Sequence, residues 1–340
     1  MHKKSVMVTG GAGFIGQNLS HLLRLHHERV FVVDNFSTSR MKPSDFPLDD
    51  EQMKCQVADV SDPEWAKSWT SAHWLGDVRE IYHLACPASP LHYQKTPVET
   101  LKTGLVGTVH VLEIAKALRC KVVIASTSEI YGDPEQHPQK ESYLGNVSCV
   151  GPRSMYDEAK RAAEAAAWAY REQHGVDVRI ARIFNTYGPG MADGDGRLIP
   201  NFIRQALRDE AIEIYGTGKQ TRSFCYVDDT VDALVRIMGE PRRDWLPIYN
   251  VGNPNEMTVE SVAHLVRKIA PPIRPGCIMG EWKEGDSPGW LGIKHLIAAK
   301  DDPRRRCPDI SRIKVQLGWE PQVDFAEGLR RTVDWFKDRQ

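Results

Sequence analysis

A glycine-rich turn between a strand-like and a helix-like segment constrains the fold of this chain more than any other feature. The apolar residues 5–9 lead into Gly10, Gly13 and Gly16, a Gly-x-x-Gly-x-x-Gly pattern. Glycines so spaced allow a tight turn, a close approach of backbone to a pyrophosphate, and close helix–strand packing. A helix that begins near Phe14 would point its first N–H groups at the phosphates. The pattern therefore predicts a dinucleotide-binding turn at the first strand of a parallel sheet.

Short apolar segments and longer amphipathic segments alternate through the first half of the chain. We expect strands at 5–9, 30–33, 54–58, 80–85, 121–126 and 176–183, and helices at 14–27, 62–73, 97–118 and 156–174. This alternation favours an α/β fold with a Rossmann-type, doubly wound parallel sheet covered by helices on both faces.

The rhythm of the pattern changes after residue 185, where glycine, proline and aspartate mark a loop. Further on we expect helices near 199–209, 258–269 and 325–338 and a strand near 211–215. Residues 224–251 are typical of a strand, a helix and a second strand, which would return to the main sheet. The second half therefore predicts a smaller α/β unit.

Charge and composition exclude several classes of protein. The 340 residues carry 44 Lys+Arg and 45 Asp+Glu, so no basic face for nucleic acid is expected. No apolar run approaches the roughly 20 residues of a membrane span, and the N-terminus shows no apolar signal region. The seven cysteines are scattered without a Cys-x-x-Cys pair, so we expect no disulfide framework, no metal site and a reducing, cytoplasmic location.

Two carboxylates follow the second and third expected strands. Asp34 lies 18 residues after Gly16, where a carboxylate binds both ribose hydroxyls and repels a 2′-phosphate. This position favours NAD over NADP. Asp59 and Val60 follow the third strand and are placed to meet the adenine, although a solvated turn is the alternative interpretation of Asp59.

The candidate catalytic groups follow the fifth strand. Tyr156 and Lys160 are four residues apart on an expected helix, so their side chains share one face. An ammonium close to a phenol lowers its pKa, which allows a tyrosinate to take a proton from a substrate hydroxyl. Thr127 and Glu129 stand at the end of the strand 121–126, over the expected ligand crevice.

The chain resembles the extended short-chain dehydrogenase/reductase family of nucleotide-sugar enzymes, also called the NAD-dependent epimerase/dehydratase family. Besides the glycine turn and the Tyr–Lys pair, the resemblance rests on residues 83–90, 126–134, 151–158, 181–189, 195–197, 220–224 and 317–321. It covers nearly the whole chain except roughly 271–300. Within the family these segments are similar to those of decarboxylases that convert UDP-glucuronate to UDP-xylose.

The resemblance implies a tightly bound NAD that oxidises C4 of the sugar, loss of CO2 from the resulting β-keto acid, and return of the hydride. Ser128 favours this reaction, because 4,6-dehydratases carry an Asp-Glu pair where this chain has Ser128-Glu129. Three alternatives stay open: an oxidative decarboxylase that releases a UDP-4-keto-pentose and NADH, a UDP-sugar 4-epimerase, and a non-catalytic NAD-binding regulatory protein.

The resemblance also implies site residues. The catalytic set is Tyr156, Lys160, Thr127, Glu129, Ser128 and Arg306. The predicted NAD contacts are Gly10, Gly13, Phe14, Ile15, Gly16, Asp34, Asn35, Ser37, Thr38, Ser39, Asp59, Val60, Leu84, Ala85, Thr103, Tyr156 and Lys160. The predicted UDP-sugar contacts are Pro87, Ser89, Tyr93, Asn185, Asn201, Tyr215, Gln220, Arg222 and Arg306; for Tyr93 a surface aromatic is the alternative.

The same resemblance predicts two domains and a dimer. Residues 1–185 with about 224–251 would bind NAD, and about 186–223 with 252–340 would bind the nucleotide sugar. A homodimer would form through a four-helix bundle of 97–118 and 156–174, although the alanines of the second helix suit the chain's own core equally well.

The chain departs from the family pattern at a few positions. Gly104 stands where Asn is usual, Leu144 replaces a usual Trp, and Cys307 replaces a usual Lys beside Arg306. The stretch 278–298 is longer than typical; a lid, an oligomer contact and a surface insertion all stay open.

Overall fold

A seven-stranded parallel sheet forms the centre of the molecule in the computed structural model, which describes residues 5–26, 29–46, 50–71, 78–270, 292–297 and 305–339. The strand order is β11-β6-β5-β4-β1-β2-β3, and every hydrogen-bonded pair in it is parallel. The strands are β1 (Ser5–Thr9), β2 (Arg29–Asp34), β3 (Met53–Val57), β4 (Val78–His83), β5 (Lys121–Thr127), β6 (Asp177–Ile183) and β11 (Ile248–Val251). The expected doubly wound parallel sheet is confirmed.

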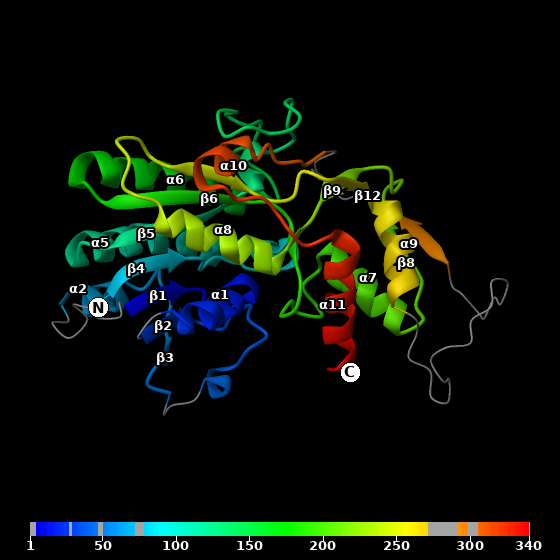
Figure 1. Cartoon of the computed structure of the whole chain (residues 1–340), viewed down its shortest axis with the longest axis horizontal. Helices are drawn as coiled ribbons and strands as arrows, with labels where there is room; N and C mark the ends of the chain where they lie inside the picture. The colour runs from blue at the N-terminus through cyan, green and yellow to red at the C-terminus, as the bar shows by residue number, and fades with distance from the viewer. Residues whose placement is uncertain are drawn as a thin grey trace.

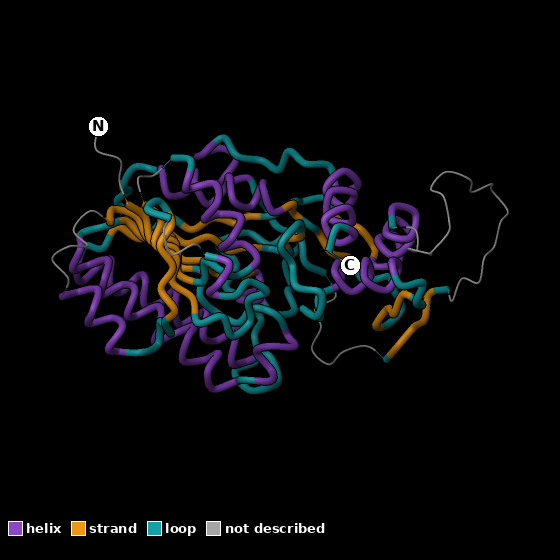
Figure 2. The backbone as a smooth tube through the Cα atoms, turned by 90° about the horizontal axis from the view of Figure 1, so that it is seen from below, coloured by secondary structure: helices purple, strands orange, loops and turns teal. Residues whose placement is uncertain are grey.

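Helices cover both faces of the sheet (Figure 1, Figure 2). On one face α1 (Phe14–Arg24) packs on α8 (Val227–Gly239), and on the other α5 (Thr108–Leu118) packs between α2 (Pro63–Ser71) and α6 (Ser154–His174). The central strands β1 and β5 are buried at nearly every position and carry continuous apolar runs, because helices cover both faces of the sheet. The segment 97–118 is not one regular helix: α4 (Pro97–Lys102) passes through a π-helical turn at Thr103–Gly107 into α5.

A smaller lobe of helices and two-stranded sheets lies beside the carboxyl edge of the main sheet (Figure 1). It contains α7 (Leu198–Leu207), α9 (Val259–Ile269) and α11 (Phe325–Lys337), which pack on one another. Its strand pairs are β7 (Thr186–Tyr187) with β10 (Cys225–Tyr226), β9 (Thr221–Ser223) with β12 (Glu256–Thr258), and β8 (Ile212–Tyr215) with β13 (Ile293–Leu296).

The chain returns from this lobe to the main sheet through α8 and β11, and β11 pairs with β6. The predicted return of residues 224–251 is therefore confirmed for the helix and the second strand, whereas β10 pairs with β7 outside the main sheet. No helix in the described ranges is long and apolar enough to span a membrane.

The pattern missed α3 (Pro90–Lys95), β7, β9, β12, β13 and α10 (Ser311–Leu317). These elements have two to seven residues, too few to show a hydrophobic period. Most of the unusual stretch 278–298 lies outside the described residues. Its described part includes β13, which pairs with β8.

Candidate active site

The predicted cofactor and catalytic residues converge at one edge of the main sheet. Because the strands are parallel, the residues that follow their carboxyl ends meet there; these are Gly10 after β1, Asp34 at the end of β2, Asp59 after β3, Leu84 after β4 and Ser128 after β5. The chain order reverses between β1 and β4, and ligands bind at such switch points in open α/β sheets.

The glycine turn between β1 and α1 fits a pyrophosphate. Gly10 has a φ of +70°, and a Cβ on Gly16 would lie 2.1 Å from the carbonyl oxygen of Gly10, so only glycine allows this packing. Gly13 is the N-cap of α1 and brings no side chain that would occupy the first N–H groups of the helix. Those donors are therefore available to an anion, as dinucleotide binding requires.

The Asp34 carboxylate connects the end of β2 to this turn. Its Oδ2 accepts a hydrogen bond from the Ala12 N–H at 3.0 Å, and its Oδ1 accepts one from the Phe36 N–H at 2.8 Å. The Gly13 and Asn35 N–H groups also interact with this carboxylate, which therefore lies directly at the glycine turn. Asn35 donates to Asp59 at 3.0 Å and joins the loops after β2 and β3. This placement suits an adenosine ribose and supports NAD rather than NADP.

We expect Asp34→Asn to weaken NAD binding about tenfold and to narrow the preference for NAD over NADP. The neutral amide keeps the shape of the side chain but has one acceptor oxygen in place of two. In the complex with NAD, a backbone N–H or a ribose hydroxyl therefore loses its acceptor, which costs about 1–3 kcal/mol of free energy. The loss of negative charge also removes repulsion of a 2′-phosphate. Equilibrium binding of NAD and NADP to the wild type and the variant measures both effects; an unchanged affinity ratio would contradict this role.

The other predicted NAD contacts differ in exposure. Asn35 and Ser37 are exposed; Gly10, Gly13, Phe14, Ile15, Thr38, Ser39, Asp59, Leu84 and Ala85 are half-buried; Gly16, Val60 and Thr103 are buried. The Ser39 hydroxyl donates to the Ala12 carbonyl and holds its loop against the glycine turn. The Val60 side chain packs against Gly107, and its carbonyl accepts a hydrogen bond from His110.

Tyr156 and Lys160 lie on α6, beside the end of β5. Tyr156 is 5% exposed, and its ring stacks on Tyr93 with 5.1 Å between centroids and 4° between planes. Burial raises the pKa of the Tyr156 hydroxyl, while a hydrogen bond with Thr127 opposes that shift. Lys160 is buried and donates to the Ala125 carbonyl at 2.8 Å. A buried phenol needs positive charge nearby to act as a base, and the Lys160 ammonium is one helical turn away.

Glu129 is held by two arginines from distant segments of the chain. Arg306 donates to both carboxylate oxygens at 2.5 and 2.9 Å, and Arg153 donates to Oε2. Burial alone would raise the pKa of Glu129, but the two guanidinium groups outweigh it and lower that pKa to about 2. The Nε of Arg306 is buried and has no hydrogen-bond partner, so the arginine keeps a donor for another acceptor.

Arg153 and Asp157 belong to this cluster, although the sequence assigned them no role. Asp157 is 5% exposed, and its Oδ1 has no hydrogen-bond partner in the structure. Burial, together with the nearby Glu129 carboxylate, raises the pKa of Asp157 to about 7. Both residues are adjacent in sequence to predicted site segments, but only the tertiary contacts identify them.

The raised pKa of Asp157 makes stability depend on pH. In the unfolded chain this carboxyl loses its proton above about pH 4, whereas in the folded protein it keeps the proton to about pH 7. Its ionisation therefore favours the unfolded state, and its contribution to stability, fully present below pH 4, falls as the pH rises towards 7.

We expect Asp157→Asn to raise the unfolding midpoint relative to the wild type at about pH 8, and to change it little at about pH 4. Thermal unfolding across this range measures the difference. Asp244→Asn, a change at an exposed aspartate, is the control. A midpoint difference that does not vary with pH would contradict the pKa of Asp157.

The predicted substrate residues divide into two groups. Ser89 donates to the Asp195 carbonyl, and Tyr93 is buried against Tyr156, so the interpretation of Tyr93 as a surface aromatic is wrong. Pro87 is half-buried in the loop between β4 and α3, which carries this first group.

The second group lies in the smaller lobe and where it meets the main sheet. Asn185 donates to the Ser223 carbonyl at 3.2 Å, and Arg222 is buried on β9. Tyr215 is 54% exposed, and its carbonyl accepts from Gln220 at 2.6 Å; Asn201 is half-buried on α7.

The structure explains one departure from the family pattern and locates two others. A Cβ on Gly104 would lie 2.8 Å from the Cβ of Ala159, so glycine suits the contact between the π-helical turn and α6. The Leu144 side chain is 84% exposed, and its carbonyl accepts a hydrogen bond from Arg161. Cys307 is buried next to Arg306.

A buried tyrosine one helical turn from a lysine, at the same sheet edge as a glycine-rich turn, is typical of enzymes that use a nicotinamide cofactor. The chain belongs to the NAD dependent epimerase/dehydratase family, whose model matches residues 6–252. NAD is therefore the cofactor, and the glycine turn and Asp34 fit it.

The chain is similar to known proteins along nearly its whole length. It is 43% identical over 335 residues to UDP-glucuronic acid decarboxylase 1 of Xenopus tropicalis, covering 98% of this chain and 72% of that protein. It is 44% identical over 335 residues to UDP-glucuronic acid decarboxylase 3 of Arabidopsis thaliana, covering 98% and 89%. Among solved structures, a dTDP-glucose 4,6-dehydratase of Streptomyces venezuelae with bound NAD matches at a TM-score of 0.82 and 26% identity, covering 98% and 97%.

Proposed function

We propose that this chain decarboxylates UDP-glucuronate to UDP-xylose with NAD as a recycled cofactor. The observation that carries the proposal is the buried Glu129–Arg306 pair: its guanidinium keeps a free donor, and its carboxylate is close enough to Tyr156 to act on that hydroxyl electrostatically. Both terminal nitrogens of Arg306 already donate to Glu129, so the buried Nε–H is the donor that this arginine offers to the C5 carboxylate of a uronate, as a charge-assisted hydrogen bond. The identity of 43–44% to UDP-glucuronic acid decarboxylases along the chain supports the same substrate.

The proposed reaction assigns a separate task to each group. Tyr156 takes the proton from O4, with Thr127 bonded to the same oxygen and Lys160 stabilising the phenolate. When bound, NAD supplies reversible acceptance of a hydride at C4. The ketone at C4 is β to the C5 carboxylate, so CO2 can leave while its bonding electrons pass into an enolate. Tyr156 then returns its proton to O4.

Glu129 and Arg306 act at the carboxylate end in this scheme. Arg306 orients the uronate. The lowered pKa of Glu129 leaves it ionised, so Glu129 with Ser128 would orient the water that gives C5 its proton after CO2 has left. Ser128 is buried and cannot readily serve as the acid that elimination of water from the sugar requires. The Ser-Glu pair therefore favours decarboxylation over 4,6-dehydration.

Product analysis tests this proposal against its alternatives. Incubation with UDP-glucuronate should release CO2 and UDP-xylose, identified by mass and NMR, without a net rise of NADH absorbance. Stoichiometric NADH with a 4-keto-pentose would instead support the oxidative decarboxylase. Interconversion of UDP-sugar C4 epimers without CO2 would support the epimerase. If NAD-loaded protein turned over no nucleotide uronate, the decarboxylase proposal would be wrong, and the result would support a non-catalytic NAD-binding regulatory protein.

We further propose that the smaller lobe holds the UDP moiety, with residues 1–185 and about 224–251 as the NAD-binding domain and about 186–223 and 252–340 as the sugar-nucleotide domain. Arg222 suits a diphosphate because its planar guanidinium can donate two bonds at once. Asn185, Asn201, Tyr215 and Gln220 are the proposed partners of the uridine and the diphosphate. The location that we propose is cytoplasmic, on the basis of the scattered cysteines.

A homodimer through α4–α5 and α6 is part of the same proposal. Large apolar side chains are exposed on these adjacent helices: Val98 and Leu101 on α4, and Trp168 on α6. Ala163 and Ala167 face the chain's own core, whereas Ala165 is exposed. Light scattering should give twice the mass of one chain, and a monomer at micromolar concentration would contradict the dimer.

A further inference from the structure

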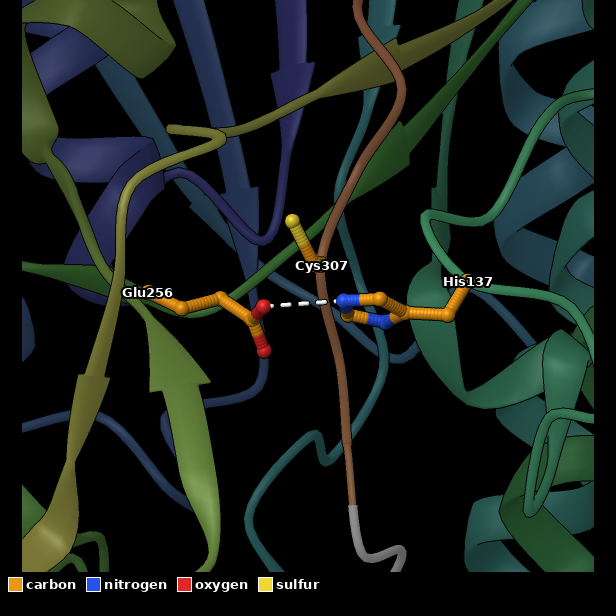
Figure 3. Close-up of side chains that lie close together, drawn as sticks. All are labelled: His137, Glu256 and Cys307. Carbon is orange, nitrogen blue, oxygen red and sulfur yellow. Dashed lines mark hydrogen bonds and ion pairs between the residues drawn. The ribbon is translucent and has the colours of Figure 1, made fainter.

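Three side chains of zinc-binding type meet outside the residues that the proposed reaction uses. These are His137, Glu256 and Cys307, and their ligand atoms all lie within 4.8 Å of one another (Figure 3). They come from the loop before α6, from β12 and from the segment after Arg306. An imidazole, a carboxylate and a thiol can each bind Zn²⁺.

The polar atoms of the first two side chains already face each other. His137 Nε2 and Glu256 Oε2 are 2.9 Å apart, and the other oxygen of Glu256 accepts a hydrogen bond from the Thr221 hydroxyl at 2.6 Å. Thr221 therefore holds the carboxylate with Oε2 turned towards the imidazole. Such an outer hydrogen bond is a common support for a metal-binding carboxylate.

Backbone hydrogen bonds hold the loop of His137 and the segment of Cys307 side by side. The Gln139 N–H donates to the Cys307 carbonyl at 2.9 Å, and the Cys307 N–H donates to the Gln139 side chain at 2.8 Å. The Asp309 N–H donates to the Gln139 carbonyl at 2.8 Å. Two of the three ligands therefore lie on segments whose backbones are already held in place. These segments lose little further conformational entropy when a metal binds.

The distances require only a small adjustment. Zn²⁺ bonds of about 2.0–2.3 Å place neighbouring ligand atoms roughly 3.3–3.8 Å apart in a tetrahedron. The ligand atoms lie within 4.8 Å of one another, so the thiol reaches that separation when its side chain turns from the Pro254 carbonyl towards the imidazole and the carboxylate. The thiol, which now donates to the Pro254 carbonyl at 3.2 Å, would give up its proton. His137 and Glu256 are partly open to solvent, which leaves room for a water as fourth ligand.

We propose that His137, Glu256 and Cys307 form a Zn²⁺ site that ties the segment of Arg306 to β12 and to the loop before α6. A nitrogen, oxygen and sulfur set favours Zn²⁺ over Mg²⁺ and Ca²⁺, which prefer oxygen alone. Cys307 replaces the lysine that is usual in the family, and an ammonium cannot ligate a metal, so the site belongs to this chain rather than to the family pattern. Because Cys307 follows Arg306, bound zinc would steady the arginine that pairs with Glu129.

The test is metal binding by the full-length, NAD-loaded protein after treatment with a chelator. We expect one zinc ion per chain after incubation with Zn²⁺ and removal of excess, and none retained after incubation with Mg²⁺. Co²⁺ in place of Zn²⁺ should produce a thiolate-to-cobalt charge-transfer band. Zinc should also raise the thermal unfolding midpoint, because a ligand that binds the folded state stabilises it.

Variants assign the ligands. Cys307→Ser and His137→Gln should each weaken zinc binding at least about tenfold and abolish the stabilisation. Cys149→Ser and His264→Gln change an exposed cysteine and an exposed histidine elsewhere and should bind zinc normally.

Zinc retention by Cys307→Ser equal to that of the wild type would overturn the proposal, as would the absence of bound zinc in the wild type. The cobalt band reports thiolate ligation in the unmodified protein. The proposal therefore stays falsifiable even if a variant does not fold, and a cobalt complex without that band would overturn it too.

Discussion

Tyr156→Phe should lower turnover of UDP-glucuronate by about 10²- to 10⁴-fold, the usual contribution of a positioned acid–base group. The change removes only the hydroxyl, which is the atom proposed to take the O4 proton. The phenylalanine ring keeps the stacking contact with Tyr93, so the fold and NAD binding should persist. The loss of the hydrogen bond with Thr127 costs about 1 kcal/mol of stability. Single-turnover formation of CO2 measures the effect.

Tyr170→Phe is a matched control on the same helix. Its hydroxyl donates to Glu113 at 2.6 Å, away from the candidate site, so the same chemical change should leave turnover intact. If Tyr156→Phe retained wild-type turnover while binding NAD, the phenol could not be the proposed base.

Arg306→Ala should lower kcat/KM for UDP-glucuronate by roughly 30- to 5000-fold. Removing one partner of a buried, hydrogen-bonded charge pair costs about 2–5 kcal/mol, which corresponds to that range. Glu129 keeps its ion pair with Arg153, so its charge is not left isolated and the protein should still fold. Affinity for UDP, which has no carboxylate, should change little. Steady-state kinetics measure the loss of kcat/KM for UDP-glucuronate, and equilibrium binding measures the affinity for UDP.

Arg305→Ala is the control because Arg305 is exposed and adjacent in sequence. Equal losses of kcat/KM in both variants would point to general electrostatic attraction of an anionic substrate rather than to the free buried donor of Arg306. An equal loss of UDP affinity and of kcat/KM in Arg306→Ala would place this arginine at the diphosphate instead of the carboxylate.

The features that could be predicted from sequence are those in which the partners are close along the chain. The glycine turn needs residues 10–16, and the Tyr156–Lys160 pair needs one helical turn. Strands buried on both faces contain continuous apolar runs, so 6–8 in β1 and 122–125 in β5 were recognisable in isolation. The placement of strand ends at one edge then follows from parallel pairing, which the alternation of strands and helices predicts.

The resemblance to a family also allowed the prediction of site residues that are far apart along the chain, which local sequence patterns cannot relate to one another. Arg306 is 177 positions from Glu129, and its basic neighbourhood alone would have indicated a solvated loop. Short pairs such as β7 with β10 were missed, because strands of two residues have no period and depend on a distant partner.

The sequence by itself determined the sheet, the cofactor turn and the spacing of the acid–base pair, because local geometry dictates each of them. Only the tertiary structure decided that Arg153 shares Glu129 with Arg306, that the charge of Glu129 helps to raise the pKa of buried Asp157, and that Tyr93 stacks on Tyr156. It also decided that scattered residues, among them a cysteine in no recognisable motif, meet as a candidate zinc site. These contacts join segments that are separated along the chain, some within the NAD-binding part and some between the two lobes, so only tertiary packing sets their distances.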